Sequence, residues 1–254
     1  MESGWDIKHI HRLIVTSHAY RQSSQMTPEQ VARDPQNRLL SHGPRFRLDA
    51  EMIRDLALSA SGLLVKTIGG PSVKPYQPPG IWEAVGYTSS NTANFVQDHG
   101  ADLYRRGVYT FWKRTAPPPM LQTFDAPSRE ACTVDRARTN TPLQALTLMN
   151  DMQFVEAARH LAARMMRQSA GFEDRVTFAF RLLTSRKPRP DELSIIRQTL
   201  DAHLAEYRAR PEAAKKLLAE GESPRDESLD PAEHAAWTMI ANLLMNMDET
   251  ITKN

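Results

Sequence analysis

Hydrophobic residues recur at helical spacing through most of the chain. Apolar side chains three or four positions apart share one face of a helix, so this periodicity marks amphipathic helices. Proline at a first helical position after Thr27 or Thr141, and Asp49 before an apolar stripe, supply the start signals. The pattern predicts helices over 5–20, 28–34, 50–67, 152–169, 173–185, 191–209 and 231–247, a shorter helix starting at Thr141-Pro142, and an exposed helix with a linker between Pro211 and Asp230.

The middle of the chain follows a different pattern. Glycine and proline are frequent from Gly69-Gly70-Pro71, which we expect to end the third helix, to about residue 100. The segment Leu103–Arg114 is rich in β-branched and aromatic residues and predicts one or two strands, which Pro117–Pro119 would end. The predicted fold is mainly α, a helical domain with a loop-rich middle and one or two short β-strands. We expect one domain over 1–254, helical over 1–70, loop-rich with short strands over 71–140, and helical over 141–254.

Composition and charge narrow the class of protein. The 254 residues are 41% hydrophobic and 24% charged, which is typical of a folded domain. With 32 basic and 30 acidic residues the net charge is +2, far from the strongly basic balance of a dedicated nucleic-acid-binding protein. No stretch of 18 apolar residues predicts a membrane span, and the first residues do not form a signal peptide.

Cysteine and histidine usage argues against metal and haem sites within this chain. Cys132 is the only cysteine, so an internal disulfide, a four-cysteine zinc site and the attachment signal of a c-type haem are excluded. His9, His11 and His18 are not spaced to share one helix face, so they do not predict a metal site. We therefore expect no cofactor and no metal in this chain.

A basic and aromatic segment is the main candidate for binding. Between residues 103 and 138 there are 7 basic and 3 acidic residues. Guanidinium groups bind carboxylate, sulfate or phosphate through paired hydrogen bonds, and aromatic faces stack on sugars. The alternative is that the aromatic side chains pack in the core while the arginines pair with local acids or loop carbonyls. The candidate ligand-binding residues are Tyr104, Arg105, Arg106, Trp112, Lys113, Arg114, Arg129, Arg136 and Arg138.

Three residues are candidates for catalysis. Asp125 and Glu130 lie five positions apart on a proline-bearing loop, where two carboxylates would serve as acid and base in glycoside chemistry. They also lie beside Arg129 and Arg136, and structural ion pairs with these arginines are the alternative. His18, at the end of the first predicted helix, offers an imidazole to a pocket, or simply faces the helix terminus.

Five longer strings carry a resemblance to a known family. They are HRLIVTSHAYRQSS (11–24), DPQNRLLSHGPRFRLDAEMIRDLAL (34–58), GGPSVKPYQPPGIWEA (69–84), LYRRGVYTFWKRTAPPP (103–119) and FDAPSREACTVDRARTNTPLQALTLMND (124–151). Together they resemble the C-terminal domain of unknown function of large planctomycete and verrucomicrobial multidomain proteins. The string LLMNMDETITK (243–253) resembles the usual end of that family.

The resemblance implies a setting for the domain. Members of that family often carry an upstream c-type cytochrome domain, so a haem c would lie on an upstream domain and outside this chain. The resemblance implies a C-terminal fragment of a periplasmic or extracellular protein, with the upstream domains as its partners. It implies no reaction.

Two function hypotheses remain open. The first is an accessory or binding domain of an exported multidomain protein that engages an anionic polysaccharide. The alternative is a catalytic domain of a cytochrome-linked oxidoreductase or carbohydrate-active enzyme, with His18, Asp125 and Glu130 in one cleft.

Overall fold

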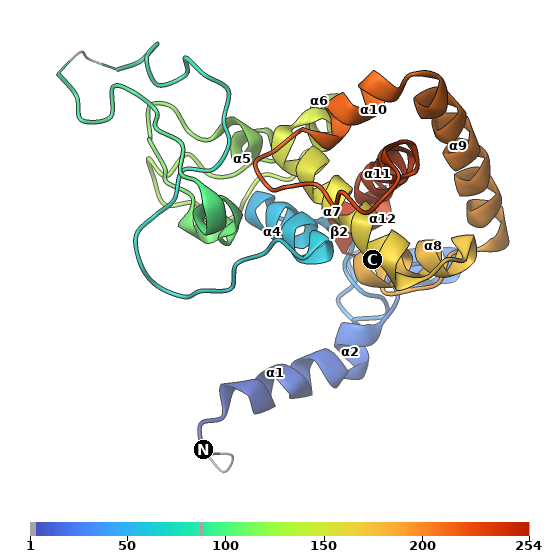
Figure 1. Ribbon diagram of the computed structural model, residues 1–254. Coiled ribbons are helices and arrows are strands. Elements are labelled where there is room, and N and C mark those ends of the chain that lie inside the picture. Colours follow the sequence, from blue (N-terminus) through green and yellow to red (C-terminus); the bar gives the residue numbers. More distant parts are fainter. Residues whose placement is uncertain (1–3, 87–88, 254) are drawn as a thin grey trace. The chain divides into compact units, whose positions relative to one another are not determined.

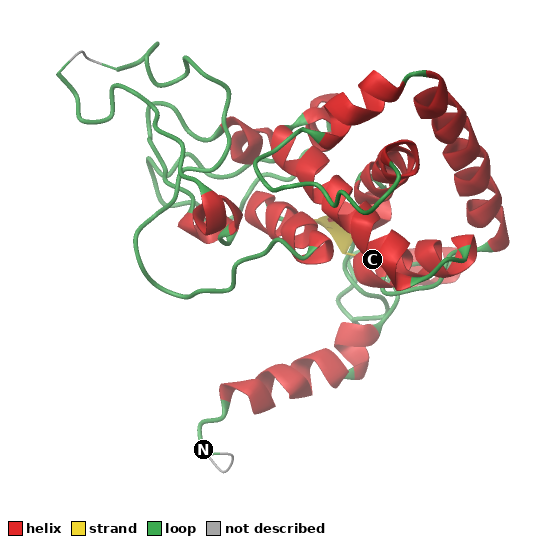
Figure 2. Ribbon diagram, in the orientation of Figure 1, coloured by secondary structure: helices red, strands yellow, loops and turns green. Residues whose placement is uncertain are grey.

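The computed structural model describes residues 4–86 and 89–253, and the chain divides into two compact units. The first unit comprises Met1–Arg47 with Thr252–Asn254, and the second comprises Leu48–Ile251. Residues 1–3, 87–88 and 254, which belong to the predicted single domain and its loop, lie outside the described part. Helices make up most of the regular structure (Figures 1 and 2), and the described residues form a single two-stranded sheet. The predicted class, mainly α with few short strands, is confirmed.

The described residues of the first unit form three helices and the two strands. The helices are α1 (Ile7–Thr16), α2 (His18–Arg21) and α3 (Pro28–Arg33), and the strands are β1 (Phe46–Arg47) and β2 (Thr252–Lys253). The strands are antiparallel, with Phe46 opposite Lys253 and Arg47 opposite Thr252. The helix predicted over 28–34 is confirmed as α3, and Thr27 and Gln30 close its first turn through a reciprocal capping box.

The second unit is built around two buried helices. These are α7 (Met152–Gln168) and α11 (Pro231–Met245), which pack against each other (Figure 1). Alanines 157, 158 and 162 of α7 are fully buried, and small side chains allow close helix contact. α11 also packs on α9 (Pro190–Ala209), on α10 (Pro211–Leu218) and on α8 (Phe172–Thr184).

Four further helices belong to the described part of the second unit. α4 (Ala50–Ser61) packs on α7, and α5 (Pro119–Thr123) packs on both α4 and α6 (Pro142–Asn150). α12 (Asp248–Ile251) packs on α8 and α11. No helix of the described residues is long and apolar enough to cross a membrane.

Four expected features of the helices are wrong in detail. The helix predicted over 5–20 is divided into α1 and α2, because Ser17 takes an extended conformation (ψ 149°) and its side chain caps α2. α4 ends at Ser61, six residues before the expected end, because Gly62 takes a left-handed conformation (φ 85°) and terminates the helix there. The helix after Pro211 is not wholly exposed, since Ala214 and Leu218 of α10 are fully buried. Asp49 stands at the N-cap of α4, but its side chain makes no capping hydrogen bond.

The predicted strand over Leu103–Arg114 is wrong. The segment contains 3₁₀ turns at Gly100–Tyr104 (η1) and Gly107–Tyr109 (η2), and it meets residues 65 and 73 only through single β-bridges. Arg54, fully buried on α4, donates to the carbonyl oxygens of Leu103 (2.8 Å) and Arg105. No neighbouring strand of the described residues pairs with the segment beyond these single bridges, so the β-rich composition does not produce a sheet here.

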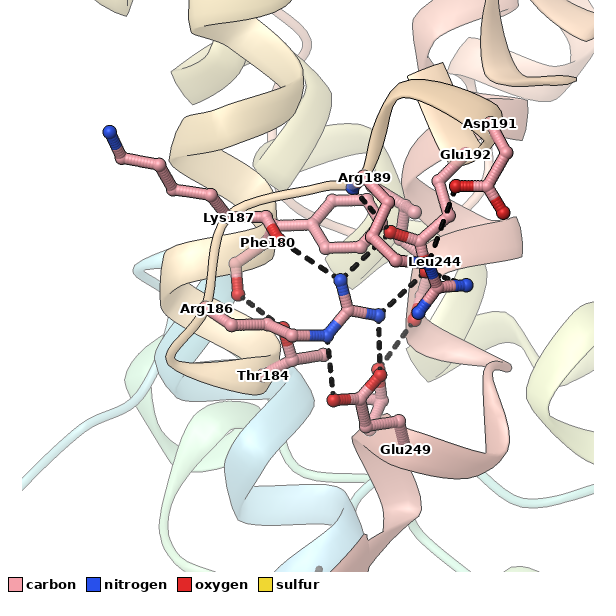
Figure 3. A network of polar contacts seen from close by, with 10 residues as sticks. Phe180, Thr184, Arg186, Lys187, Arg189, Asp191, Glu192, Leu244 and Glu249 are labelled. Carbon is pink, nitrogen blue, oxygen red and sulfur yellow. Dashed lines mark hydrogen bonds and ion pairs between the residues drawn. The ribbon is translucent and has the colours of Figure 1, made fainter. Parts of the chain in front are cut away.

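An arginine clamp holds the connection between α8 and α9 (Figure 3). The Arg186 guanidinium lies between two carboxylates, donating to Glu192 at 2.6 and 2.8 Å and to Glu249 at 2.6 and 2.8 Å. Its planar face lies 5.1 Å from the centre of the Phe180 ring. The hydrogen bonds from Arg186 lower the pKa of Glu192 from 4.5 to about 2. Arg186 therefore ties α9 and α12 to the end of α8.

We expect Glu192→Gln to destabilise the protein in a pH-dependent way. Because the folded pKa lies below the unfolded one, the ionised carboxylate stabilises the fold fully above about pH 4.5, and this contribution is lost as pH falls towards 2. At pH 7 the variant should lose about 1–3 kcal/mol of unfolding free energy. Urea unfolding at pH 7 and at pH 3 measures both values.

Glu212→Gln is the matched control, because Glu212 is paired with Lys215 on an exposed surface. It should change stability by less than about 0.5 kcal/mol. A Glu192→Gln deficit as large at pH 3 as at pH 7 would contradict the role of the ionised carboxylate.

Candidate functional site

Two of the predicted binding residues hold loop backbone in place. Arg105 is buried and donates to the carbonyl of Pro71 at 2.8 Å and to that of Gly69, with its guanidinium over the Tyr109 ring at 4.0 Å. Lys113 donates to the carbonyl of Thr92 at 2.7 Å. These cations satisfy carbonyl groups of a region with little regular structure.

Four more of the predicted cations lie within ion-pair distance of carboxylates. Arg136 donates to Glu51 at 2.8 Å, and Arg138 lies 3.6 Å from Asp49. The other two pairs are Arg106 with Asp55 at 3.5 Å and Arg114 with Glu130 at 3.6 Å. Both members of the Arg114–Glu130 pair are more than half exposed, so that pair is weakly held.

The loop after α5 contains two residues in an uncommon backbone conformation. Asp125 (φ 60°) and Arg129 (φ 61°) both lie in the left-handed region. The Asp125 carboxylate accepts from the backbone N–H of Thr139 at 2.8 Å, which connects this loop to the start of α6. Arg129 lies 4.6 Å from the ring of Trp112, whose indole N–H donates to the carbonyl of Ser128. The Asp125 carboxylate thus has a structural role, because its hydrogen bond to Thr139 joins the two ends of the segment between α5 and α6.

The predicted catalytic residues lie in different units. His18 is exposed on α2 in the first unit, whereas Asp125 and Glu130 belong to the second. Their convergence in one cleft, and ligand binding by the segment 103–138, stay predictions.

A buried carboxylate on α7 is the centre of a second group of polar residues. Glu156 has no exposed surface, and its Oε1 atom accepts from the hydroxyl of Tyr104 at 2.9 Å. It also accepts from the backbone N–H of Ser223 at 2.7 Å and from the Ser223 hydroxyl at 2.5 Å. Burial and the neighbouring Glu156 charge raise the pKa of Tyr104, so the phenol stays protonated and able to donate. Of the predicted ligand-binding residues, Tyr104 is the one that reaches this group.

Arg159 and His160, on the next turn of α7, also bind Ser223, which lies in the loop after α10. Arg159 donates to the carbonyl of Ser223 at 2.7 Å and to its hydroxyl at 2.9 Å. The Nε2 atom of His160 lies 2.6 Å from the Ser223 hydroxyl oxygen. Burial, followed by the charge of Arg159, lowers the pKa of His160 to about 4, so its ring is neutral near pH 7.

The contact between His160 and Ser223 has the distance of a base and nucleophile pair, but its surroundings differ. In a catalytic triad the carboxylate binds the histidine and orients it. Here the carboxylate of Glu156 binds the serine itself. This arrangement anchors the loop after α10 against α7.

A cavity of about 530 Å³ lies beside this anchor, and we call it the α7 pocket. Four arginines and two histidines contribute to its lining, against the two carboxylates Asp226 and Glu227. Its lining residues are Ser61, Gly62, Arg159, His160, Ala163, Arg164, Arg167, Pro224, Arg225, Asp226, Glu227 and His234. All of them belong to the second unit.

The four arginines of the α7 pocket differ in their partners. Arg167 binds Asp226, and Arg159 lies 3.6 Å from Glu156. Arg164 donates to the carbonyls at the end of α4, including that of Ala60. Among the described residues no carboxylate lies within ion-pair distance of Arg164 or Arg225, so the pocket keeps an excess of positive charge.

Several buried polar atoms of the pocket residues have no hydrogen-bond partner within the described structure. They are Nε of Arg159, one terminal nitrogen of Arg225 and Nδ1 of His234. Arg159 and His234 are both 1% exposed. A buried donor or acceptor without a partner costs about 1–3 kcal/mol, so a ligand that pairs with these atoms would gain affinity.

The sequence contains a signal for this site that the apolar pattern hides. Residues 156, 159, 160, 164 and 167 recur at intervals of three and four, and therefore lie on one face of α7. The apolar periodicity predicts only the helix over 152–169, and none of these five residues is among the candidates for binding or catalysis. No metal-binding group of three or more His, Cys, Asp or Glu side chains occurs among residues 4–86 and 89–253.

The fold and the pocket define a mainly helical protein with an arginine-rich pocket along a central helix. The chain belongs to the family described as "Protein of unknown function (DUF1553)", whose sequence pattern matches residues 1–200. The match includes α7 and stops before Ser223 and His234. No curated protein matches the chain, and no solved structure does.

Gly221 makes the close approach of the loop to Glu156 possible. Its φ is 86°, and a Cβ atom there would lie 2.6 Å from Cγ of Glu156 and closer still to the carboxylate. We therefore expect Gly221→Ala to lose about 1–2 kcal/mol from backbone strain and about 1–3 kcal/mol more from overlap with Glu156. Chemical denaturation measures the total.

Gly80→Ala is the matched control. Gly80 has a similar φ of 82°, and a Cβ atom added there would have no neighbour within 4 Å. Gly80→Ala should therefore lose only the free energy of backbone strain, about 1–2 kcal/mol. Equal losses in the two variants would show that the loop does not depend on close contact with Glu156.

Proposed function

We propose that this domain binds an anionic ligand in the α7 pocket. The observation that carries the proposal is the excess of arginine over carboxylate around buried nitrogen atoms without partners. Guanidinium groups form strong, paired hydrogen bonds with carboxylate, sulfate and phosphate. The volume of about 530 Å³ lies within the range of about 300–1,000 Å³ usual for small-ligand sites.

An anionic polysaccharide is the ligand class that we propose for this site. The strings in residues 11–151 that resemble a family of exported multidomain proteins support this choice, since such a domain would meet extracellular polymers. On this proposal the chain is an accessory domain of a periplasmic or extracellular protein, next to upstream domains that include a c-type cytochrome. A pocket of this size would take the charged group and one or two sugar units of the polymer.

We expect the protein to bind dextran sulfate but not dextran at low ionic strength. Arg225→Gln should weaken binding by about threefold to tenfold, because it removes a pocket cation that has no carboxylate partner. Added salt should weaken binding to dextran sulfate further, since the attraction is electrostatic. Fluorescence anisotropy with labelled polymer measures each affinity.

Two control variants separate the pocket from other basic surfaces. Arg208→Gln removes the same charge from an exposed position on α9 and should leave the affinity within about twofold. Arg114→Gln probes the basic segment predicted from the sequence. If Arg114→Gln abolishes binding while Arg225→Gln does not, the segment 103–138 is the binding site and the α7 pocket is not.

A further inference from the structure

His234 of the α7 pocket has a defined proton position. Its Nε2 atom lies 3.0 Å from the carbonyl oxygen of Arg159. A carbonyl oxygen only accepts hydrogen bonds, so Nε2 must carry the proton and donate. The side chain is therefore the Nε2–H tautomer whenever the ring is neutral.

The second ring nitrogen is then an acceptor. Burial lowers the pKa of His234, which favours the neutral ring near pH 7. In the neutral Nε2–H tautomer, Nδ1 holds a lone pair and no proton. This atom is buried and has no partner among the described residues.

The residues that line the pocket thus carry unpaired donors and one unpaired acceptor. Arg159 and Arg225 offer N–H groups, which suit a negatively charged oxygen. Nδ1 of His234 would repel such an oxygen, since both carry lone pairs. It requires an O–H or N–H donor on the ligand instead.

We propose that His234 makes the α7 pocket specific for anions that carry a hydroxyl group near the charged group, with the hydroxyl donating to Nδ1. This inference rests on the proposed anion binding and deepens it. Sugar acids and sugar sulfates have this combination of groups, whereas simple carboxylates and inorganic anions with no proton do not. His234 is then a specificity-determining residue, and the arginines supply the attraction for charge.

A pair of ring carboxylates tests the proposal. Glucuronate carries hydroxyl groups beside its carboxylate, and cyclohexanecarboxylate has the same charge on a ring without hydroxyls. We expect the protein to bind glucuronate about tenfold more tightly, the size of one well-made hydrogen bond to a buried acceptor. Titration followed by NMR measures both affinities.

The variant His234→Gln separates the role of Nε2 as a donor to the Arg159 carbonyl from the role of Nδ1 as an acceptor for the ligand. The Gln side-chain N–H₂ can keep the bond to the carbonyl of Arg159, while the acceptor at the Nδ1 position is lost. We expect this variant to bind the two carboxylates within about twofold of each other. Arg225→Gln should weaken both ligands and keep their ratio.

A measurement on the unaltered protein covers the case in which His234→Gln does not fold. The ¹⁵N resonance of Nδ1 in His234 should shift on addition of glucuronate, because its lone pair accepts a hydrogen bond, and should not shift with cyclohexanecarboxylate. Binding of both anions with equal affinity, or an unchanged preference in His234→Gln, overturns the role of His234 alone. If neither anion binds, the proposed anion binding fails as well.

Discussion

The arrangement of the second unit around the pocket depends on the burial of one carboxylate, that of Glu156. A carboxylate taken out of water destabilises the fold by several kcal/mol unless hydrogen bonds and opposite charge compensate it. The compensation comes from segments far along the chain, Tyr104 at 52 residues and Ser223 at 67 residues from Glu156. The hydrogen bonds from Ser223 to the Oε1 atom of Glu156 therefore hold the loop after α10 against α7, and that loop forms one wall of the pocket.

Arginine plays two distinct parts in this protein. Arg54 on α4 and Arg105 both donate to backbone carbonyls of the loop-rich middle, those of Leu103 and Pro71. Such bonds allow long irregular segments to be buried without leaving carbonyl groups unpaired. Around the α7 pocket, Nε of Arg159 and one terminal nitrogen of Arg225 remain without partners, as does Nε of Arg105 in the middle segment. The pocket is the place proposed for ligand binding because its unpaired nitrogens belong to residues that line a cavity with more arginines than carboxylates.

Most helices follow directly from the sequence because their signals are local. Apolar periodicity and the caps at Thr27 and Thr141 depend only on residues three or four positions apart, and the structure contains the corresponding helices. The strand expected over 103–114 failed because β-structure requires a partner strand, and aromatic and β-branched composition does not supply one. The expected end of α4 near Gly69 is wrong because Gly62, seven residues earlier, takes the left-handed conformation that terminates a helix.

The sequence by itself determined the helical class, the positions of most helices and the polar face of α7 that carries Glu156, Arg159 and His160. Only the tertiary structure decided that Ser223 and His234 meet that face. The physical reason is the distance along the chain over which each interaction acts. A helix face is set by neighbours within two turns. The pairing of a buried carboxylate with a distant loop depends instead on how the whole unit packs. The sequence shows the positive charges of Arg105 and Lys113, which made them candidates for binding. Only the fold shows that these charges donate hydrogen bonds to backbone carbonyls.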